Sequence, residues 1–309
     1  MRRMPEINPH IFRAYDIRGV VGNDLTEEVA ELLGRGYGTF IRRVSGARIA
    51  VGRDNRPSSE ELQRRFIGGA AAAGCQVIDL GLSLSPMLYF AVCYLGLDGG
   101  VNVTGSHNPV EYNGLKLTTR DAAPIAEDEI QEIRRIVESR TFASGQGSAE
   151  TRSVAQDYLR EVGKRAKLHR PLKVALDAGN GTAGLFAPQL LTDLGCEVIE
   201  LYCDSDGTFP HHLPDPEVEE YLEDLKAQVL RHRADLGIAL DGDGDRLGVI
   251  DESGRRHEAD EILILLARDF LTRHPGGRVL MDVKSSQVLV DDINAHDGEP
   301  IMWKTGHSL

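Results

Sequence analysis

The stretch Arg48-Ile49-Ala50-Val51-Gly52-Arg53-Asp54 decides the fold, because the chain repeats its pattern twice. The other copies are Lys173-Val174-Ala175-Leu176-Asp177 and Arg278-Val279-Leu280-Met281-Asp282. Each copy has a basic residue, then a short apolar run, then an aspartate. A short apolar run that ends at a polar turn predicts a buried strand. We therefore expect three equivalent strands, each of which leads into a loop.

A second apolar run follows each copy at a similar distance, over residues 74–79, 195–200 and 299–303. Stretches of helical character, such as 60–73 and 184–194, lie between the paired runs. Strand, helix, strand in this order forms a βαβ unit with parallel strands. Recurrence of this unit predicts an α/β fold made of repeated domains, with mixed, mostly parallel sheets between helices.

The length of 309 residues exceeds that of one ordinary domain. A Ser/Gly-rich stretch at 144–148 and a turn at 251–254 are the best candidates for linkers. We therefore predict domain 1 over residues 1–146, domain 2 over 147–253 and domain 3 over 254–309.

A third apolar run in each of the first two units leads into a polar loop. Residues 101–103 precede the loop 104–109, and residues 236–240 precede the loop 241–246. The third unit stops at Leu309, soon after its second strand. We expect two complete domains and an incomplete third domain, and a shorter third domain is the alternative.

The composition restricts the possible partners. A formal net charge of -13 argues against nucleic-acid binding, which needs a basic surface, but a local basic cluster can still bind a small anion. The longest apolar block, residues 262–267, is too short to span a bilayer, so we expect no membrane partner. The four cysteines include no closely spaced pair and the start has no apolar run, which favours a reduced, cytoplasmic protein. We also expect a monomer.

Three alternating carboxylates, Asp241, Asp243 and Asp245, follow one predicted strand and precede another over 247–251. The glycines between them permit a tight backbone. Three hard oxygen ligands on one short loop suit Mg²⁺, with coordination positions left for a substrate. A solvated acidic turn is less favoured, because clustered carboxylates repel one another without a cation.

An EF-hand calcium loop is a second interpretation of this stretch. Asp241, Asp243, Asp245 and Glu252 occupy loop positions 1, 3, 5 and 12, but position 6 is Arg246 where glycine is needed. The flanking segments also have the pattern of strands rather than helices. We therefore favour a Mg²⁺ site, with Arg246 beside it as a phosphate-binding side chain.

A serine lies in the other polar loop, Thr104-Gly105-Ser106-His107-Asn108-Pro109. Serine acts as a nucleophile only when a base or a metal activates it, and the adjacency of His107 does not by itself make that histidine the base. The Gly-x-Ser-x-Gly pattern of hydrolases is absent, which disfavours a hydrolytic triad. The structural alternative is a turn capped by serine and asparagine. A metal site near a serine loop suggests phosphoryl transfer.

The two loops together resemble the signature pair of the α-D-phosphohexomutase family. Three further stretches resemble motifs of its bacterial phosphomannomutase/phosphoglucomutase branch: Phe12 to Gly19, Asn113 to Lys116 and Lys304 to Ser308. The resemblance extends through the whole chain, and the two long motifs occur in the family's order.

This resemblance implies a role for each matching residue. Ser106 would carry the phosphoryl group as phosphoserine, and Mg²⁺ would bind Asp241, Asp243, Asp245 and an oxygen of that phosphoserine. Four further residues would stabilise charge, move protons or flank the reaction centre: Arg18, Lys116, Arg246 and His107.

Three residues would contact the sugar or its phosphate by the same resemblance: Tyr15, Lys284 and His307. Each has a simpler alternative. Tyr15 can serve only in packing, Lys284 can be an ordinary charge at the end of a strand, and His307 can be an ordinary loop histidine.

The resemblance also implies a reaction, the reversible transfer of phosphoryl between the 1- and 6-positions of mannose or glucose phosphate. The partners would be a hexose phosphate and a hexose 1,6-bisphosphate intermediate. The family's sugar-reading loop of domain 3 and its fourth domain, which binds the remote phosphate, have no counterpart here. Binding energy from parts of the substrate that are remote from the reacting atoms contributes to catalysis. Because the site for the remote phosphate has no counterpart, we expect weak or no activity from this form. The alternatives are an inactive fragment that binds Mg²⁺ and sugar phosphate, and a metal-dependent phosphatase that uses Ser106 or Asp241.

Overall fold

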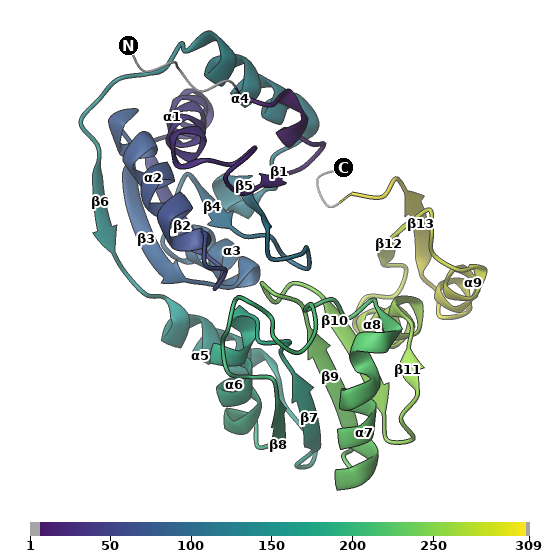
Figure 1. The fold of residues 1–309 in the computed structure, drawn as a ribbon. Helices are drawn as coiled ribbons and strands as arrows, with labels where there is room; N and C mark the ends of the chain where they lie inside the picture. The colour runs from purple at the N-terminus through teal and green to yellow at the C-terminus, as the bar shows by residue number, and fades with distance from the viewer. Residues whose placement is uncertain (1–6, 307–309) are drawn as a thin grey trace.

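The computed structural model describes residues 7–306 and places their strands in three sheets (Figure 1). The first sheet has the order β1-β5-β4-β2-β3-β6. Its strands are β1 (Ile17–Val20), β2 (Arg48–Arg53), β3 (Gln76–Leu82), β4 (Gly99–Val103), β5 (Tyr112–Thr119) and β6 (Ser148–Thr151).

Helices cover both faces of this first sheet. They are α1 (Glu27–Val44), α2 (Ser59–Ala72), α3 (Ser85–Tyr94) and α4 (Glu127–Ser139). Side chains of β2 alternate between the faces: Ile49 and Val51 pack in the core that includes α1, α2 and α4, and Ala50 packs in the core that includes α3. This burial on both sides explains why the central strands are almost entirely apolar.

The second sheet has the order β11-β10-β9-β7-β8. Its strands are β7 (Lys173–Asp177), β8 (Glu197–Leu201), β9 (Leu236–Leu240), β10 (Leu247–Asp251) and β11 (Arg256–His257). The accompanying helices are α5 (Ala155–Arg165), α6 (Ala187–Asp193) and α7 (Glu223–His232). Leu225 and Val229 of α7 pack on Ala175 of β7 and Ala239 of β9.

The third sheet pairs β12 (Arg278–Asp282) with β13 (Glu299–Trp303). Two helices, α8 (Ala259–Arg273) and α9 (Gln287–Ala295), share a small core with it. Figure 1 shows this part of the chain beside the second sheet rather than the first. No helix within residues 7–306 is long and apolar enough to cross a membrane.

The strand pairing confirms the predicted α/β fold and its repeat. The pairs β2–β3, β7–β8 and β12–β13 are all parallel, and β4 and β9 run parallel to β2 and β7. The sheets are mixed because β1, β5, β10 and β11 pair antiparallel with their neighbours. The polar loops therefore follow equivalent strands, β4 and β9, as predicted.

Two features differ from the expectations. The predicted helix over 184–194 is divided into a 3₁₀ turn, Thr182–Leu185, and α6, which has a proline in its first turn. In addition, β6 pairs with β3, and β11 pairs with β10, so both sheets continue past the predicted boundaries at 146 and 253. All four residues of β6 are exposed, so no apolar run marks it as a strand. The division into three domains stays a prediction.

Candidate active site

Ser106 has a constrained backbone in the loop after β4. Its φ is 51°, in the left-handed region, and the residue is 2% exposed. A serine in this region costs of order 1–3 kcal/mol, so neighbouring groups must hold it there. Its N–H donates to Thr104 Oγ1 at 2.8 Å, and the amide of Asn108 donates to the Gly105 carbonyl at 2.8 Å.

Asp54, directly after β2, anchors the start of this loop. Its Oδ2 accepts hydrogen bonds from Thr104 Oγ1 at 2.8 Å and from the Gly105 N–H at 3.0 Å. The same oxygen lies 3.2 Å from Arg56 Nε, and both side chains of this ion pair are buried. Sequence reasoning named Asp54 only as the end of a strand.

Arg56 anchors the rest of the loop and was missed by sequence reasoning. Its side chain is fully buried. A Cβ on Gly105 would lie 2.4 Å from Arg56 Nε, so glycine is required for this close contact. The guanidinium donates to four backbone carbonyls, those of Ser106 (2.8 Å), Asn108 (2.5 Å), Pro109 (2.6 Å) and Tyr112 (3.2 Å).

The segments after β7 and β8 connect the second sheet to Arg56 and its neighbour Asn55. The ring of Phe209 lies 5.0 Å from the Arg56 guanidinium, within range of a cation–π contact. Asn55 donates to the Asn180 carbonyl at 2.7 Å and to Ser205 Oγ at 2.8 Å. Segments of the first and second sheets are therefore in contact next to the serine loop.

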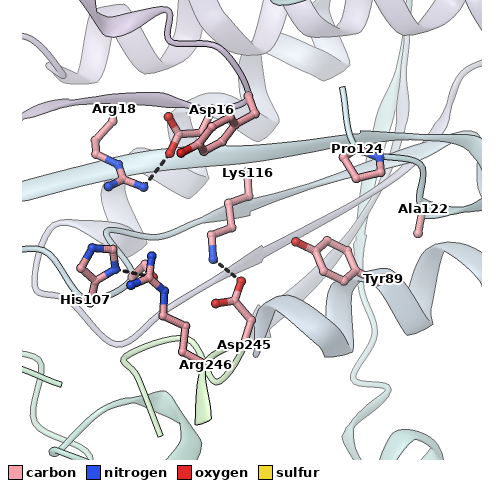
Figure 2. Close-up of a pocket in the computed structure, with 11 residues that line it drawn as sticks. Asp16, Arg18, Tyr89, His107, Lys116, Ala122, Pro124, Asp245 and Arg246 are labelled. Atoms are coloured by element: carbon pink, nitrogen blue, oxygen red, sulfur yellow. Dashed lines mark hydrogen bonds and ion pairs between the residues drawn. The ribbon is translucent and has the colours of Figure 1, made fainter. Parts of the chain in front are cut away.

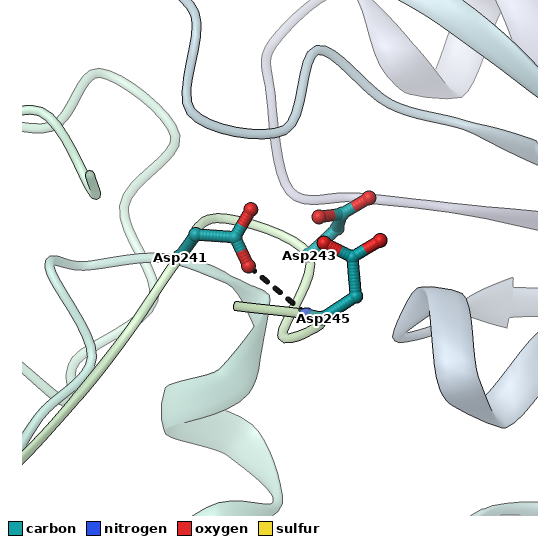
Figure 3. Close-up of side chains that lie close together, drawn as sticks. All are labelled: Asp241, Asp243 and Asp245. Carbon is teal, nitrogen blue, oxygen red and sulfur yellow. Dashed lines mark hydrogen bonds between the residues drawn. The ribbon is translucent and has the colours of Figure 1, made fainter. Parts of the chain in front are cut away.

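The three predicted aspartates come together in the loop between β9 and β10 (Figure 3). Asp241, Asp243 and Asp245 each offer an oxygen, and these atoms lie within 4.8 Å of one another. Asp241 Oδ1 accepts the backbone N–H groups of Asp245 and Arg246, each at 3.0 Å, which closes the loop. Asp241 and Asp243 are completely buried.

The serine loop and the acidic loop are in direct contact. The Ser106 hydroxyl donates to Asp241 Oδ2 at 2.7 Å, across 135 residues of sequence. A Cβ on Gly242 would lie 2.6 Å from the Ser106 carbonyl, so a larger residue would push the loops apart. His107 Nδ1 lies 3.2 Å from Ser106 Oγ. Burial, together with the charges of Arg246 and Arg18, lowers the pKa of His107 below its ordinary value of 6.5.

The charges in the acidic loop are only partly balanced. Burial and the neighbouring carboxylates raise the pKa of Asp241 well above 3.8. Lys116 Nζ lies 2.7 Å from Asp243 Oδ2 and 2.5 Å from Asp245 Oδ2. Burial alone would raise the pKa of Asp243, but Lys116 and a hydrogen bond from Ser85 lower it to about 2. One ammonium faces three carboxylates, so the group remains short of positive charge.

The acidic loop has the properties of a metal site. Asp243 Oδ1 is buried and has no hydrogen-bond partner among the described residues. A buried carboxylate oxygen without a partner is unfavourable unless a ligand completes it. The donors are all hard oxygens, the type that small divalent cations prefer. These three residues could therefore hold a metal ion.

A pocket of about 590 Å³ opens beside the two loops (Figure 2). It brings together most of the predicted site residues. Its lining includes Tyr15, Arg18, Ser106, His107, Lys116, Asp245 and Arg246. Its basic groups make the pocket suited to an anionic substrate.

Lys284, a residue predicted to bind the substrate, does not line this pocket. Lys284 lines a separate groove of about 790 Å³ between the second and third sheets, and Arg246 lines both spaces. His307 lies outside the described residues. The proposed role of Lys284 therefore depends on a substrate that extends past Arg246.

The pocket also includes residues that sequence reasoning missed. Asp16 is buried, and its Oδ2 accepts a hydrogen bond from Arg18 at 2.6 Å, which fixes the guanidinium in the pocket (Figure 2). Tyr89, Ala122 and Pro124 form another part of the lining. Asp16 lies within the motif Phe12 to Gly19, but the motif gave it no role. No local pattern marks Tyr89, Ala122 or Pro124, because their positions in the pocket depend on the tertiary fold.

The loop that supports the acidic residues contains a histidine with two acceptors. His212 Nε2 lies 3.1 Å from Asp177 Oδ2, and its Nδ1 lies 2.8 Å from the Leu213 carbonyl. Pro214, two residues later, packs beside Gly179 and Gly242. Burial opposes protonation of His212, but Asp177 and the Leu213 carbonyl outweigh it and raise its pKa above 6.5.

We expect His212 to make stability depend on pH. Because its folded pKa is raised, its contribution is fully present below about pH 6.5 and is lost as the pH rises through the folded pKa. His212→Gln should therefore lower the thermal unfolding midpoint more at pH 6 than at pH 8.5. His232→Gln, a control at an exposed position, should lower the thermal unfolding midpoint by the same small amount at pH 6 and at pH 8.5. An equal effect of His212→Gln at the two pH values would contradict the prediction.

Comparisons with known proteins show which family this chain resembles in sequence and fold. The chain matches the sequence family phosphoglucomutase/phosphomannomutase, with its alpha/beta/alpha domains I, II and III over residues 9–144, 156–254 and 258–309. It is 45% identical to the phosphomannomutase/phosphoglucomutase of Pseudomonas aeruginosa, over 99% of this chain and 66% of that protein. The phosphoglucomutase of Neisseria meningitidis serogroup B is 43% identical, with 99% and 67% covered.

A solved structure shows the same fold. The crystal structure of a phosphoglucomutase/phosphomannomutase family protein from Burkholderia thailandensis superimposes with a TM-score of 0.95 and 43% identity. The match covers 98% of this chain and 68% of that one. The chain therefore spans about two thirds of the length of these relatives.

Proposed function

Because this chain belongs to the phosphoglucomutase/phosphomannomutase family, we propose that it acts as a phosphohexomutase. The reaction is the reversible transfer of phosphoryl between the 1- and 6-positions of mannose or glucose phosphate, through a hexose 1,6-bisphosphate. The observation that supports this most is the 2.7 Å hydrogen bond from the Ser106 hydroxyl to Asp241, at the edge of a basic pocket. This contact supports a role for Ser106 as the nucleophile, because it lies between a cluster of carboxylates and the groups that would bind a phosphate.

We propose Mg²⁺ as the cation, held by Asp241, Asp243, Asp245 and an oxygen of phosphorylated Ser106. The buried, unpartnered Asp243 Oδ1 and the hard oxygen donors support this assignment. When bound, the ion supplies positive charge that stabilises negative charge developing on the transferring phosphoryl group.

The side chains of the pocket have different roles in the proposed transfer. Phosphorylated Ser106 gives its phosphoryl group to a sugar hydroxyl: the serine Oγ–P bond breaks, a sugar O–P bond forms, and the proton of the sugar hydroxyl passes to the released serine oxygen. After the bisphosphate reorients, Ser106 takes up the other phosphoryl group, and that sugar O–P bond breaks. His107 Nδ1, kept neutral by its lowered pKa, accepts the Ser106 hydroxyl proton in that second step and passes it to the released sugar oxygen. Arg18 and Arg246 bind the phosphate oxygens, and Lys116 stabilises their charge.

Direct observation of both sugar phosphates tests this function. The chain is incubated with mannose 1-phosphate, Mg²⁺ and a trace of hexose 1,6-bisphosphate, and the phosphorus NMR spectrum is followed. Slow growth of the 6-phosphate signal is the expected result. Release of inorganic phosphate without the 6-phosphate would instead favour the phosphatase alternative. An unchanged spectrum would contradict both activities and favour the inactive fragment that binds Mg²⁺ and sugar phosphate.

Asp243, whose Oδ1 has no hydrogen-bond partner among the described residues, should matter strongly for metal binding. We expect Asp243→Asn to weaken Mg²⁺ binding by at least roughly tenfold, because it removes a charged oxygen ligand. Isothermal titration calorimetry measures this directly. Asp193→Asn, at the exposed end of α6, is a control of the same chemistry and should leave the affinity unchanged. Equal affinities of the two variants would argue against the assigned metal site.

A further inference from the structure

Asp243 is held from outside its own loop by the first residue of α3. The N–H of Ser85 donates to the Asp243 carbonyl at 3.0 Å, and the Ser85 hydroxyl donates to Asp243 Oδ2 at 2.6 Å. Both residues are completely buried. Ser85, in a helix that packs on the first sheet, therefore holds both the backbone and the side chain of Asp243, which lies in a loop of the second sheet.

A second residue fixes the direction of the Ser85 hydroxyl. Asn102, buried in β4, donates from Nδ2 to Ser85 Oγ at 3.1 Å. A hydroxyl has one proton to donate and can accept other hydrogen bonds. Because Asn102 occupies the oxygen as a donor, the single Ser85 proton is left to point at Asp243.

The two oxygens of Asp243 consequently have different surroundings. Oδ2 accepts from Ser85 and lies 2.7 Å from Lys116 Nζ. Oδ1 is buried and has no hydrogen-bond partner in the part of the chain that the structure describes. The contacts to Oδ2 prevent the carboxylate from turning over and keep the same oxygen available.

We propose that Ser85 and Asn102 are positioning residues for the metal site: they fix the Asp243 carboxylate so that Oδ1 stays free to bind the cation. This inference rests on the proposed Mg²⁺ site. Neither residue lines the substrate pocket, and neither belongs to the acidic loop. Residues that orient a metal ligand in this way commonly change metal affinity by 10–100-fold when they are removed.

Calorimetric titration of the chain with Mg²⁺ alone, without substrate, tests the proposal. We expect Ser85→Ala to weaken binding by roughly tenfold or more. The matched control is Ser83→Ala, because Ser83 is equally buried but its hydroxyl donates to the Leu84 carbonyl and not to the acidic loop. Equal Mg²⁺ affinity of Ser85→Ala and Ser83→Ala would overturn the proposal.

Asn102→Ala provides a second variant that leaves Ser85 in place. It should weaken Mg²⁺ binding less than Ser85→Ala does. Added to Ser85→Ala, it should cause no further loss, because it acts through the Ser85 hydroxyl. Additive losses of Mg²⁺ affinity would contradict this coupling. A general loss of packing would not produce such coupling between the two variants. A wild-type chain that binds no Mg²⁺ would overturn the metal site itself, a result distinguishable from failure of the positioning role alone.

Discussion

Ser106→Ala should abolish phosphoryl exchange between the 1- and 6-positions: a version of the enzyme that includes the fourth domain should lose turnover on the order of 10⁴-fold or more, and the weak exchange expected of this chain should fall to background. The variant lacks the only oxygen that can form the phosphoserine, and no other hydroxyl replaces it between Asp241 and His107 among the residues that line the pocket. The rate is measured by phosphorus NMR with mannose 1-phosphate and a trace of bisphosphate.

Two further measurements make this result specific to Ser106. Binding of Mg²⁺ to Ser106→Ala should persist, because Asp241, Asp243 and Asp245 remain. Ser83→Ala, which removes another buried hydroxyl from the same part of the chain, should retain most of its activity. Wild-type turnover by Ser106→Ala would show that the serine does not carry the phosphoryl group.

The second large effect concerns stability. We expect Arg56→Met to destabilise the first sheet and its helices by about 3–5 kcal/mol, because it leaves Asp54 as an uncompensated buried charge. It also removes the donors to four carbonyls of the serine loop. Arg56→Lys should recover little of this, because an ammonium cannot reproduce the planar arrangement of donors.

Urea unfolding followed by circular dichroism measures this loss, and a surface arginine provides the reference. Arg64→Met in α2 removes an exposed ion pair with Glu61, which should change the stability by less than about 1 kcal/mol. If Arg56→Met unfolded at the same urea concentration as Arg64→Met, the anchoring role of Arg56 would be wrong.

Three strands could be predicted from sequence because each has an apolar run, which is buried on both faces in β2 and β7 and on one face in β12. The apolar runs of β2, β7 and β12 each end in an aspartate, and all three pair in parallel with the next predicted strand. The short strand β6 could not be predicted in this way. Its residues are exposed, so backbone pairing with β3 rather than side-chain burial defines it as a strand.

The two loops of the site could be predicted because each carries its reactive groups within a few residues. The structure brings Ser106 and the aspartates into contact from separate sheets, which supports the interpretation that linked them. Lys284 shows the limit of this approach, because the resemblance that suggested its role gave no indication that it would face a different groove.

The supporting residues could not be predicted because their roles exist only across long sequence separations. Arg56 contacts carbonyls 50–56 positions away, and Ser85 contacts an aspartate 158 positions away. Each reads in the sequence as an ordinary polar residue near the start of a helix. Only the fold shows that one fixes the serine loop and the other fixes a candidate metal ligand.

Phosphorylation of Ser106 itself is the most direct test of the proposed function. The chain is incubated with glucose 1,6-bisphosphate and Mg²⁺, digested, and analysed by mass spectrometry. We predict one phosphoryl group on the peptide that contains Ser106, absent from Ser106→Ala and lost again when glucose 6-phosphate is added in excess. Turnover of sugar phosphates while Ser106 stays unmodified, or a transferable phosphoryl group on another residue, would contradict the account.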